Sequence, residues 1–139
     1  MPTHAGHCHC GNIEVEFDTA IAPEQMAVRA CQCSFCRKHG ARTAVDPKGQ
    51  VRIRVKDEGL LARYQWNLRT AEFLVCARCG CYVAALTSPD RSLGTVNVNV
   101  LDEAGRFDRP PQPVDYDAET PEERRRRREA GWTPAVWRR

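Results

Sequence analysis

Eight cysteines in three short clusters constrain this chain of 139 residues more than any other feature. They follow the patterns C-x-C, C-x-C-x-x-C and C-x-x-C-x-C, at Cys8, Cys10, Cys31, Cys33, Cys36, Cys76, Cys79 and Cys81. Disulfide frameworks are typical of small secreted domains that lack a sufficient core. Here 42% of the residues are hydrophobic, and the N-terminus has no basic start followed by an apolar stretch. We therefore expect a cytoplasmic protein whose reduced thiols bind metal.

Two of the clusters carry a glycine where a metal-binding turn needs one. A C-x-x-C pair places two sulfurs on one tight turn, where both reach one ion at about 2.3 Å. Gly11 follows Cys10 and Gly80 follows Cys79, at positions where such a turn commonly takes a positive φ. The glycines favour zinc binding more strongly than the number of cysteines does alone.

Short stretches of alternating polar and apolar residues predict a mainly β domain. Residues 12–17 and 51–55 alternate cleanly, residues 72–75 and 82–86 flank the third cysteine cluster, and residues 96–101 alternate again. No apolar run approaches the roughly 20 residues that a membrane helix needs. We therefore expect no membrane association.

The C-terminal segment differs from the rest, and we expect two parts: a zinc-binding domain at 1–110 and a tail at 111–139. The proline-rich stretch 109–113 predicts a stiff linker. An N-cap, a first-turn proline, a capping-box glutamate and a terminal glycine then predict a short helix: Thr120, Pro121, Glu123 and Gly131.

Five consecutive arginines, 124–128, lie in this predicted helix. We interpret them as a solvated helix face, because three ion pairs four residues apart are available: Glu122–Arg126, Glu123–Arg127 and Arg125–Glu129. No aromatic residues interleave with the run, as a stacking platform for bases would require. The formal net charge of +3 also falls to about zero when zinc-bound thiolates and two zinc ions are counted. Nucleic acid is therefore not the expected partner.

Spacing alone does not decide which cysteines share an ion. One arrangement is a zinc ribbon, with a longer intervening stretch than usual, that uses Cys33, Cys36, Cys76 and Cys79. The other joins the first and third clusters in a four-cysteine site, Cys8, Cys10, Cys76 and Cys79, and leaves a three-cysteine site of Cys31, Cys33 and Cys36. A closed four-cysteine site is structural, whereas a three-ligand site keeps a position for water or substrate. An exogenous thiol bound there would be held as the nucleophilic thiolate.

The cysteine clusters and their surroundings resemble the family of glutathione-dependent formaldehyde-activating enzymes, which includes the centromere protein V type. The matching segments are 8–11, 31–41, 73–80 and 96–102. The resemblance implies a β-tent fold with a structural zinc at Cys8, Cys10, Cys76 and Cys79 and a catalytic zinc at Cys31, Cys33 and Cys36. It also implies a reaction that joins glutathione and formaldehyde into S-hydroxymethylglutathione, classed as a carbon–sulfur lyase in reverse.

Two hypotheses of function follow. The first is a zinc-dependent carbon–sulfur lyase that acts on the adduct of a small-molecule thiol, such as glutathione, with formaldehyde or another small aldehyde. The second is a non-catalytic zinc module that binds glutathione, protein or nucleic acid. His39 and Arg37 follow the second cluster, where His39 could transfer a proton and Arg37 could pair with a thiolate or a substrate carboxylate. For His39 we favour an exposed surface position, and for Arg37 a surface role explains the residue equally well. Cys81 is interpreted as a spare buried thiol, and the alternative is that it tunes or replaces a ligand in the site built on Cys76 and Cys79.

Overall fold

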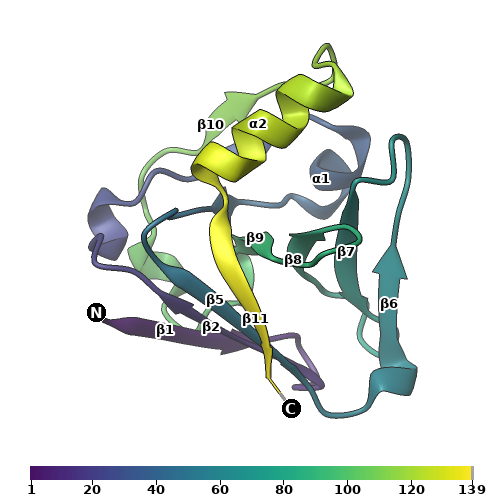
Figure 1. Ribbon diagram of the computed structural model, residues 1–139. Helices are drawn as coiled ribbons and strands as arrows, with labels where there is room; N and C mark the ends of the chain where they lie inside the picture. Colours follow the sequence, from purple (N-terminus) through teal and green to yellow (C-terminus); the bar gives the residue numbers. More distant parts are fainter. Residues whose placement is uncertain (139) are drawn as a thin grey trace.

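The computed structural model describes residues 1–138, which fold around strands that meet in one connected sheet system (Figure 1). The strands are β1 (Thr3–His7), β2 (Ile13–Asp18), β3 (Arg29–Cys31), β4 (Thr43–Ala44), β5 (Gln50–Val55), β6 (Leu61–Tyr64), β7 (Ala71–Cys76), β8 (Tyr82–Thr87), β9 (Leu93–Asn97), β10 (Gln112–Val114) and β11 (Thr133–Arg138). The α-helices of the described part are α1 (Ser34–His39) and α2 (Pro121–Gly131). The prediction of a mainly β fold with a short C-terminal helix is confirmed.

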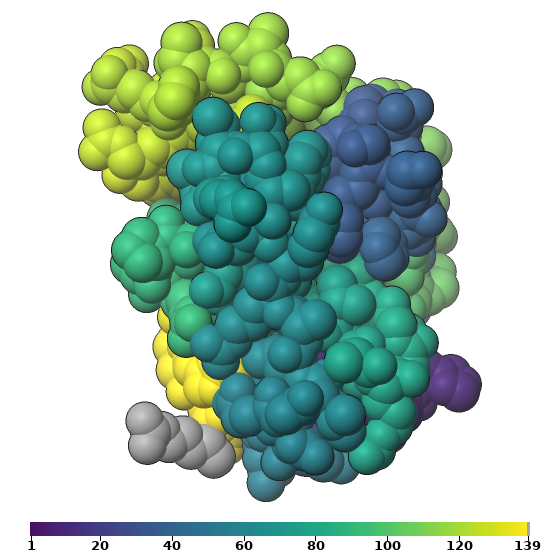
Figure 2. Space-filling view, turned by 90° about the vertical axis from the view of Figure 1, so that its right-hand side faces the viewer, coloured from purple at the N-terminus to yellow at the C-terminus, as the bar shows by residue number. Residues whose placement is uncertain are grey.

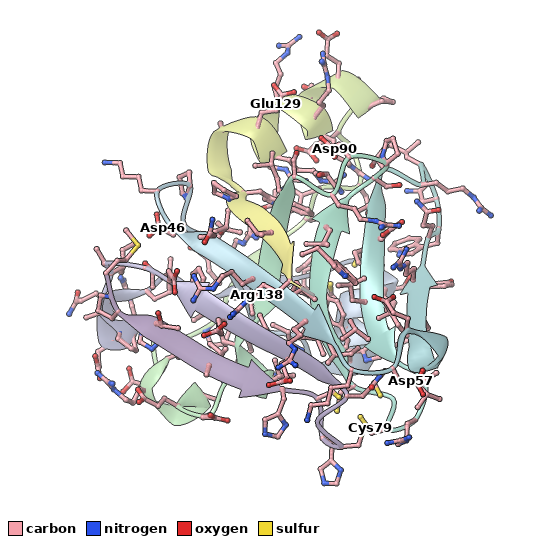
Figure 3. All side chains as sticks on the ribbon, turned by 60° about the horizontal axis from the view of Figure 1, so that its bottom comes forward. Asp46, Asp57, Cys79, Asp90, Glu129 and Arg138 are labelled. Carbon is pink, nitrogen blue, oxygen red and sulfur yellow. The ribbon has the colours of Figure 1, made fainter. Side chains whose placement is uncertain are left out.

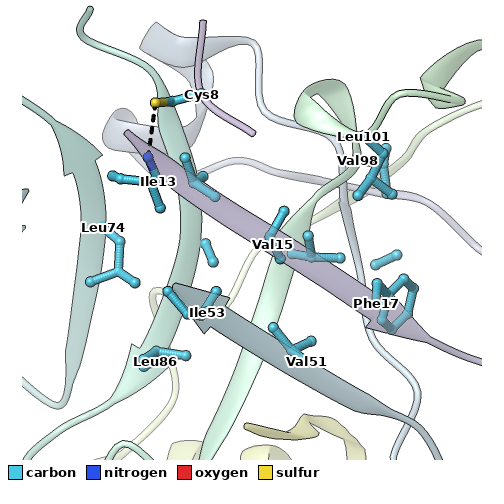
Figure 4. Close-up of a cluster of buried hydrophobic side chains, with 14 of the residues drawn as sticks. Cys8, Ile13, Val15, Phe17, Val51, Ile53, Leu74, Leu86, Val98 and Leu101 are labelled. Atoms are coloured by element: carbon cyan, nitrogen blue, oxygen red, sulfur yellow. Dashed lines mark hydrogen bonds between the residues drawn. The ribbon is translucent and has the colours of Figure 1, made fainter. Parts of the chain in front are cut away.

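Two groups of strands enclose the main core. Strands β1, β2 and β5 are antiparallel neighbours on one side, and β6, β7, β8 and β9 are antiparallel neighbours on the other. Strand β11 connects them, since it runs parallel to β5 and antiparallel to β9 (Figure 1). Because strand side chains alternate between faces, β2 buries Ile13, Val15 and Phe17 and leaves its glutamates partly exposed (Figure 4).

Four of the five predicted stretches are strands, and the fifth, at residues 96–101, is mostly wrong, because β9 spans Leu93–Asn97 and includes only residues 96 and 97 of it. At residues 96–101 the strand ends at Asn97, and Val98–Val100 form a 3₁₀ turn. The Asn97 side chain accepts the N–H of Asn99 at 3.2 Å, which favours a turn over continued pairing. The predicted stretches do not include β1, β3, β4, β6, β10 or β11.

The C-terminal segment is more than a linker and a helix. Its helix has the predicted capping box, in which Thr120 Oγ1 accepts the N–H of Glu123 at 3.1 Å and the Glu123 carboxylate accepts the N–H of Thr120 at 2.8 Å. The expected linker contains β10, which pairs in parallel with β3. The boundary at residue 110 stays a prediction; in the structure, strands from both sides of it belong to the same sheet system.

The arginine run is split between two faces of α2. Two predicted ion pairs form, Glu122–Arg126 at 3.0 Å and Arg125–Glu129 at 3.9 Å, and Glu129 points away from the body of the protein (Figure 3). Arg127 pairs with Glu119 at 2.8 Å instead of with Glu123, whose carboxylate caps the helix. Arg128 is only 9% exposed. The solvated-face interpretation is therefore right for one side of the helix and wrong for Arg128. No helix among residues 1–138 has the length and apolar character to cross a membrane.

Candidate metal centres

Two hairpin connections bring the first and third cysteine clusters together. Cys8 and Cys10 lie in the connection between β1 and β2, and Cys76 and Cys79 lie at the end of β7 and in the turn to β8. The four sulfurs all lie within 4.8 Å of one another and could hold a metal ion. Figure 3 shows sulfur atoms gathered near Cys79, at the edge of the protein away from α2. Of the two arrangements that spacing left open, the sulfur positions match the one that joins the outer clusters.

Glycines shape both turns of this four-cysteine cluster, as the sequence predicts. Gly11 has φ 87° and Gly80 has φ 80°, in the region that favours glycine. The N–H of Gly80 donates to the Cys76 carbonyl at 2.8 Å, which closes the second turn. The N–H of Ile13 donates to Cys8 Sγ at 3.2 Å (Figure 4). Such N–H donors aimed at sulfur stabilise thiolates.

The sulfur distances fit a tetrahedral ion. Zinc bound at about 2.3 Å to four sulfurs in a tetrahedron separates them by about 3.8 Å. Cys8 Sγ lies 3.8 Å from Cys10 Sγ, which lies 3.5 Å from Cys76 Sγ. Burial raises the pKa of Cys8 to about 12, so a cation is needed to hold this buried sulfur as a thiolate at neutral pH. At Cys79 burial also acts to raise the pKa, but backbone donors at Cys81 and Cys10 bring it down to about 6.

The second cluster is built at the start of α1. Cys31 ends β3, Cys33 is the N-cap of α1, and Cys36 lies in the first turn of that helix. Cys33 Sγ accepts the N–H of Cys36 at 3.4 Å, and Gly40 ends the helix with φ 57°. The three sulfurs lie within 4.8 Å of one another and could also hold a metal ion.

The three sulfurs lie so close together that a negative charge on one disfavours a negative charge on the others. The neighbouring Cys33 and Cys36 sulfurs lower the pKa of Cys31 to about 2, whereas the Cys31 sulfur raises the pKa values of Cys33 and Cys36. One sulfur therefore takes the negative charge at the expense of the other two. A divalent cation offsets the repulsion between the thiolates, because it stabilises all three of them together. Three cysteine sulfurs are therefore suitable ligands for zinc.

The two clusters differ in what surrounds them. Cys8 and Cys76 are fully buried against the main core. Cys31, Cys33 and Cys36 instead line an open cavity, whose empty space is about 810 Å³ when the open solvent at its mouth is included. Other walls come from α2 and from the segment between β6 and β7. In Figure 2 this segment, in teal, lies between α2 in yellow-green and the α1 region in blue. The three-cysteine cluster can therefore meet a small molecule, whereas the four-cysteine cluster is anchored in the core by Cys8 and Cys76 and reaches the surface at Cys10.

Other residues singled out in the sequence do not enter this cavity. His39 is exposed and packs on the ring of Phe35 at 4.4 Å between centroids, and Arg37 is exposed on α1. Cys81 lies beside the four-cysteine cluster, where its sulfur accepts the N–H of His9 at 3.4 Å. Six further residues that line the cavity are not among those predicted from the sequence: Arg29, Trp66, Tyr82, Arg124, Arg128 and Trp132. Only the i, i+4, i+8 spacing of Arg124, Arg128 and Trp132 could have suggested a shared face.

The fold and the two clusters make this a small, mainly β protein with two candidate metal sites, one of four thiols and one of three thiols that faces a cavity. Residues 3–116 match the model of the glutathione-dependent formaldehyde-activating enzyme family, and the chain belongs to that family. A crystal structure of a Rhodobacter sphaeroides protein is similar, with 33% sequence identity, coverage of 78% of this chain and 97% of that chain, and a TM-score of 0.57. Membership associates the chain with glutathione-dependent formaldehyde activation and with glutathione as a small-molecule partner.

Proposed function

We propose that the protein is a zinc-dependent carbon–sulfur lyase-type enzyme that acts on the adduct of glutathione, or another thiol, with formaldehyde or a small aldehyde. The observation that carries this proposal is the position of Cys31, Cys33 and Cys36 in the wall of an open cavity. These three residues would hold a catalytic zinc, and Cys8, Cys10, Cys76 and Cys79 would hold a structural zinc. When bound at the three-cysteine site, zinc supplies a Lewis acid that lowers the pKa of an incoming thiol.

Aromatic residues around the three cysteines hold them in place. Phe35 of α1 stacks on Phe73 with 4.6 Å between centroids and meets Tyr82 edge-on at 5.0 Å, which fixes α1 against β7 and β8. Cys36 is thereby held at 5% exposure above Tyr82 and Trp132, which belong to the same apolar cluster. Burial raises the pKa of Tyr82, so its hydroxyl stays protonated. The open cavity therefore has an apolar floor beside the three sulfurs.

The proposed reaction forms one new bond, between the sulfur of the thiol and the carbonyl carbon of the aldehyde. The sulfur of the thiol ligand, having lost its proton to solvent, attacks the carbonyl carbon of the aldehyde. The C–S bond forms as the π electrons of the C=O bond move to oxygen, which takes up a proton from solvent. The reverse direction breaks the same C–S bond and releases thiol and aldehyde. The role of the cavity is to orient the two reactants, which removes much of the entropy cost of bringing them together.

The alternative of a non-catalytic module that binds nucleic acid receives less support. Arg124 and Arg127 have side chains 13% and 22% exposed and both pair with Glu119. With Arg128 buried, the arginine run presents only Arg125 and Arg126 openly at the surface. Two exposed cations that already pair with glutamates make a weak phosphate-binding surface.

We expect zinc-loaded protein to accelerate the exchange between glutathione, formaldehyde and S-hydroxymethylglutathione in proportion to protein concentration. The reason is that a bound thiol is kept as thiolate beside the aldehyde. Exchange NMR spectroscopy at equilibrium measures the rate directly, with zinc salt alone as the control. A rate equal to that of the spontaneous reaction would contradict the enzymatic proposal. Saturable glutathione binding without acceleration would instead support the non-catalytic thiol-binding module.

A further inference from the structure

Unpartnered N–H donors gather around the cavity beside the three-cysteine cluster. Within residues 1–138, four buried side-chain nitrogens without a hydrogen-bond acceptor belong to residues that line it: Arg29 Nε, Arg128 Nε, Trp66 Nε1 and Trp132 Nε1. A fifth, Arg124 Nε, makes no hydrogen bond and has Glu119 Oε1 as an ion-pair partner at 3.5 Å. Buried donors are almost always paired in folded proteins, so a cluster of exceptions requires an explanation. All five are donors, and an acceptor-rich ligand would satisfy them.

The cavity also has unbalanced positive charge. Arg128 donates to the carbonyl and the hydroxyl of Thr70 at 3.1 and 2.8 Å, and its guanidinium lies 4.6 Å from the ring centroid of Trp132. Arg29 donates to the hydroxyls of Tyr116 at 3.4 Å and Thr95 at 3.3 Å. Neither guanidinium forms an ion pair with a carboxylate of the described residues.

The other charges near the cavity reduce this excess only in part. The three cysteine sulfurs lie in the same wall, and the positive charge of Arg29 helps to lower the pKa of Cys31; three thiolates around one divalent ion would carry one net negative charge. Glu119 is shared by Arg127 at 2.8 Å and Arg124 at 3.5 Å. Asp117 lines the cavity from an exposed position. Burial, with repulsion from Arg127 and Arg124, lowers the pKa of Arg128 to about 10, which still leaves it charged at neutral pH. A buried cation without a partner is costly, and an anionic ligand group would offset that cost.

We propose that Arg29, Arg124 and Arg128 form a subsite that binds a carboxylate of the thiol ligand while its sulfur lies at the three-cysteine cluster. This inference rests on the proposed function, since it assumes that the cluster receives a thiol. Guanidinium groups suit a carboxylate because their N–H donors match its two oxygens. Arg124 and Arg128 lie on α2, beyond the residues that match the family model. The C-terminal helix of this chain therefore selects thiols that carry a carboxylate.

The test compares 3-mercaptopropionate with its uncharged methyl ester, by isothermal titration calorimetry on zinc-loaded protein. We expect the wild type to bind the acid at least about tenfold more tightly than the ester, since hydrogen bonds to charged groups contribute that much. Arg124→Gln and Arg29→Gln should each remove most of this preference, and affinity for the ester should stay the same. Arg126→Gln is the matched control: it removes the same charge from the outer face of α2, where Arg126 pairs only with Glu122.

The ratio of the affinities for acid and ester separates loss of the carboxylate contact from a general structural effect. A distorted cavity would weaken the binding of acid and ester alike. Equal affinity of the wild type for acid and ester, with both bound, would overturn the carboxylate subsite and leave the thiol site intact. The same conclusion follows if Arg124→Gln, Arg29→Gln and Arg126→Gln all retain the wild-type preference. Absence of binding by either thiol would contradict the thiol site itself, and the subsite with it.

Discussion

Cys79→Ser is expected to unfold the protein or make it insoluble. Cys79 is one of four sulfurs that connect the β1–β2 hairpin to the β7–β8 hairpin, and Cys8 and Cys76 of the same cluster are fully buried in the main core. Structural zinc contributes about 10–16 kcal/mol in zinc-finger peptides, comparable to the whole stability of a small domain at about 5–15 kcal/mol. Loss of one proposed ligand therefore removes a large share of the folding free energy.

Circular dichroism during thermal unfolding measures this effect, and Cys81→Ser is its matched control. Cys81 is a partly exposed cysteine two residues away and lies outside the four-sulfur group. Its replacement should change the melting temperature by only a few degrees, since a serine oxygen can also accept the N–H of His9. If Cys79→Ser fails to express, chelation of the wild type provides the second measurement and should lower its melting temperature steeply. A stable Cys79→Ser protein together with a chelator-resistant wild type would contradict a structural role for this cluster.

Cys33→Ser is expected to abolish the exchange activity while the fold persists. Cys33 caps α1 by accepting the N–H of Cys36 at 3.4 Å, and serine is among the best N-cap residues. The helix start is therefore preserved, whereas the proposed catalytic site loses one of three thiolate ligands. We expect the rate to fall to the spontaneous level and the melting temperature to fall by no more than several degrees, equivalent to about 1–2 kcal/mol.

The measurements are exchange NMR for the rate and circular dichroism for the fold. Cys81→Ser again serves as the control, because it removes a thiol outside the cavity and should retain full activity. Wild-type activity in Cys33→Ser would exclude the three-cysteine cluster as the catalytic site. Loss of both fold and activity would contradict the separation of the two clusters into structural and functional sites.

The metal-binding turns could be predicted from the sequence because they are local. Gly11 and Gly80 adopt the positive φ values expected of them, and Thr120 and Glu123 form the expected capping box. Each of these features depends on contacts within a few residues, where residue type limits the conformation. The alternation of β2 and β5 is similarly visible, since one face of each strand is buried.

Contacts between residues far apart in the sequence were harder to predict. Spacing did not decide which cysteines meet, because that depends on how two hairpins pack, and only the resemblance to the family indicated the answer. Strand β1 contains Gly6, whose position allows the backbone of Val100 and Leu101 to approach within distances that a Cβ would prevent, and its composition does not suggest a strand. Strand β11 includes Pro134 and pairs with strands distant in the sequence. The arginines of the cavity were interpreted as solvated because the fold of α2 over the three-cysteine cluster could not be seen.

Zinc stoichiometry by native mass spectrometry tests the central claim of two unequal metal sites most directly. We predict two zinc ions per wild-type chain and one per chain in folded Cys33→Ser, with the remaining ion at Cys8, Cys10, Cys76 and Cys79. A single ion in the wild type that is lost in Cys33→Ser would contradict the account, because it would indicate one site shared between the second and third cysteine clusters.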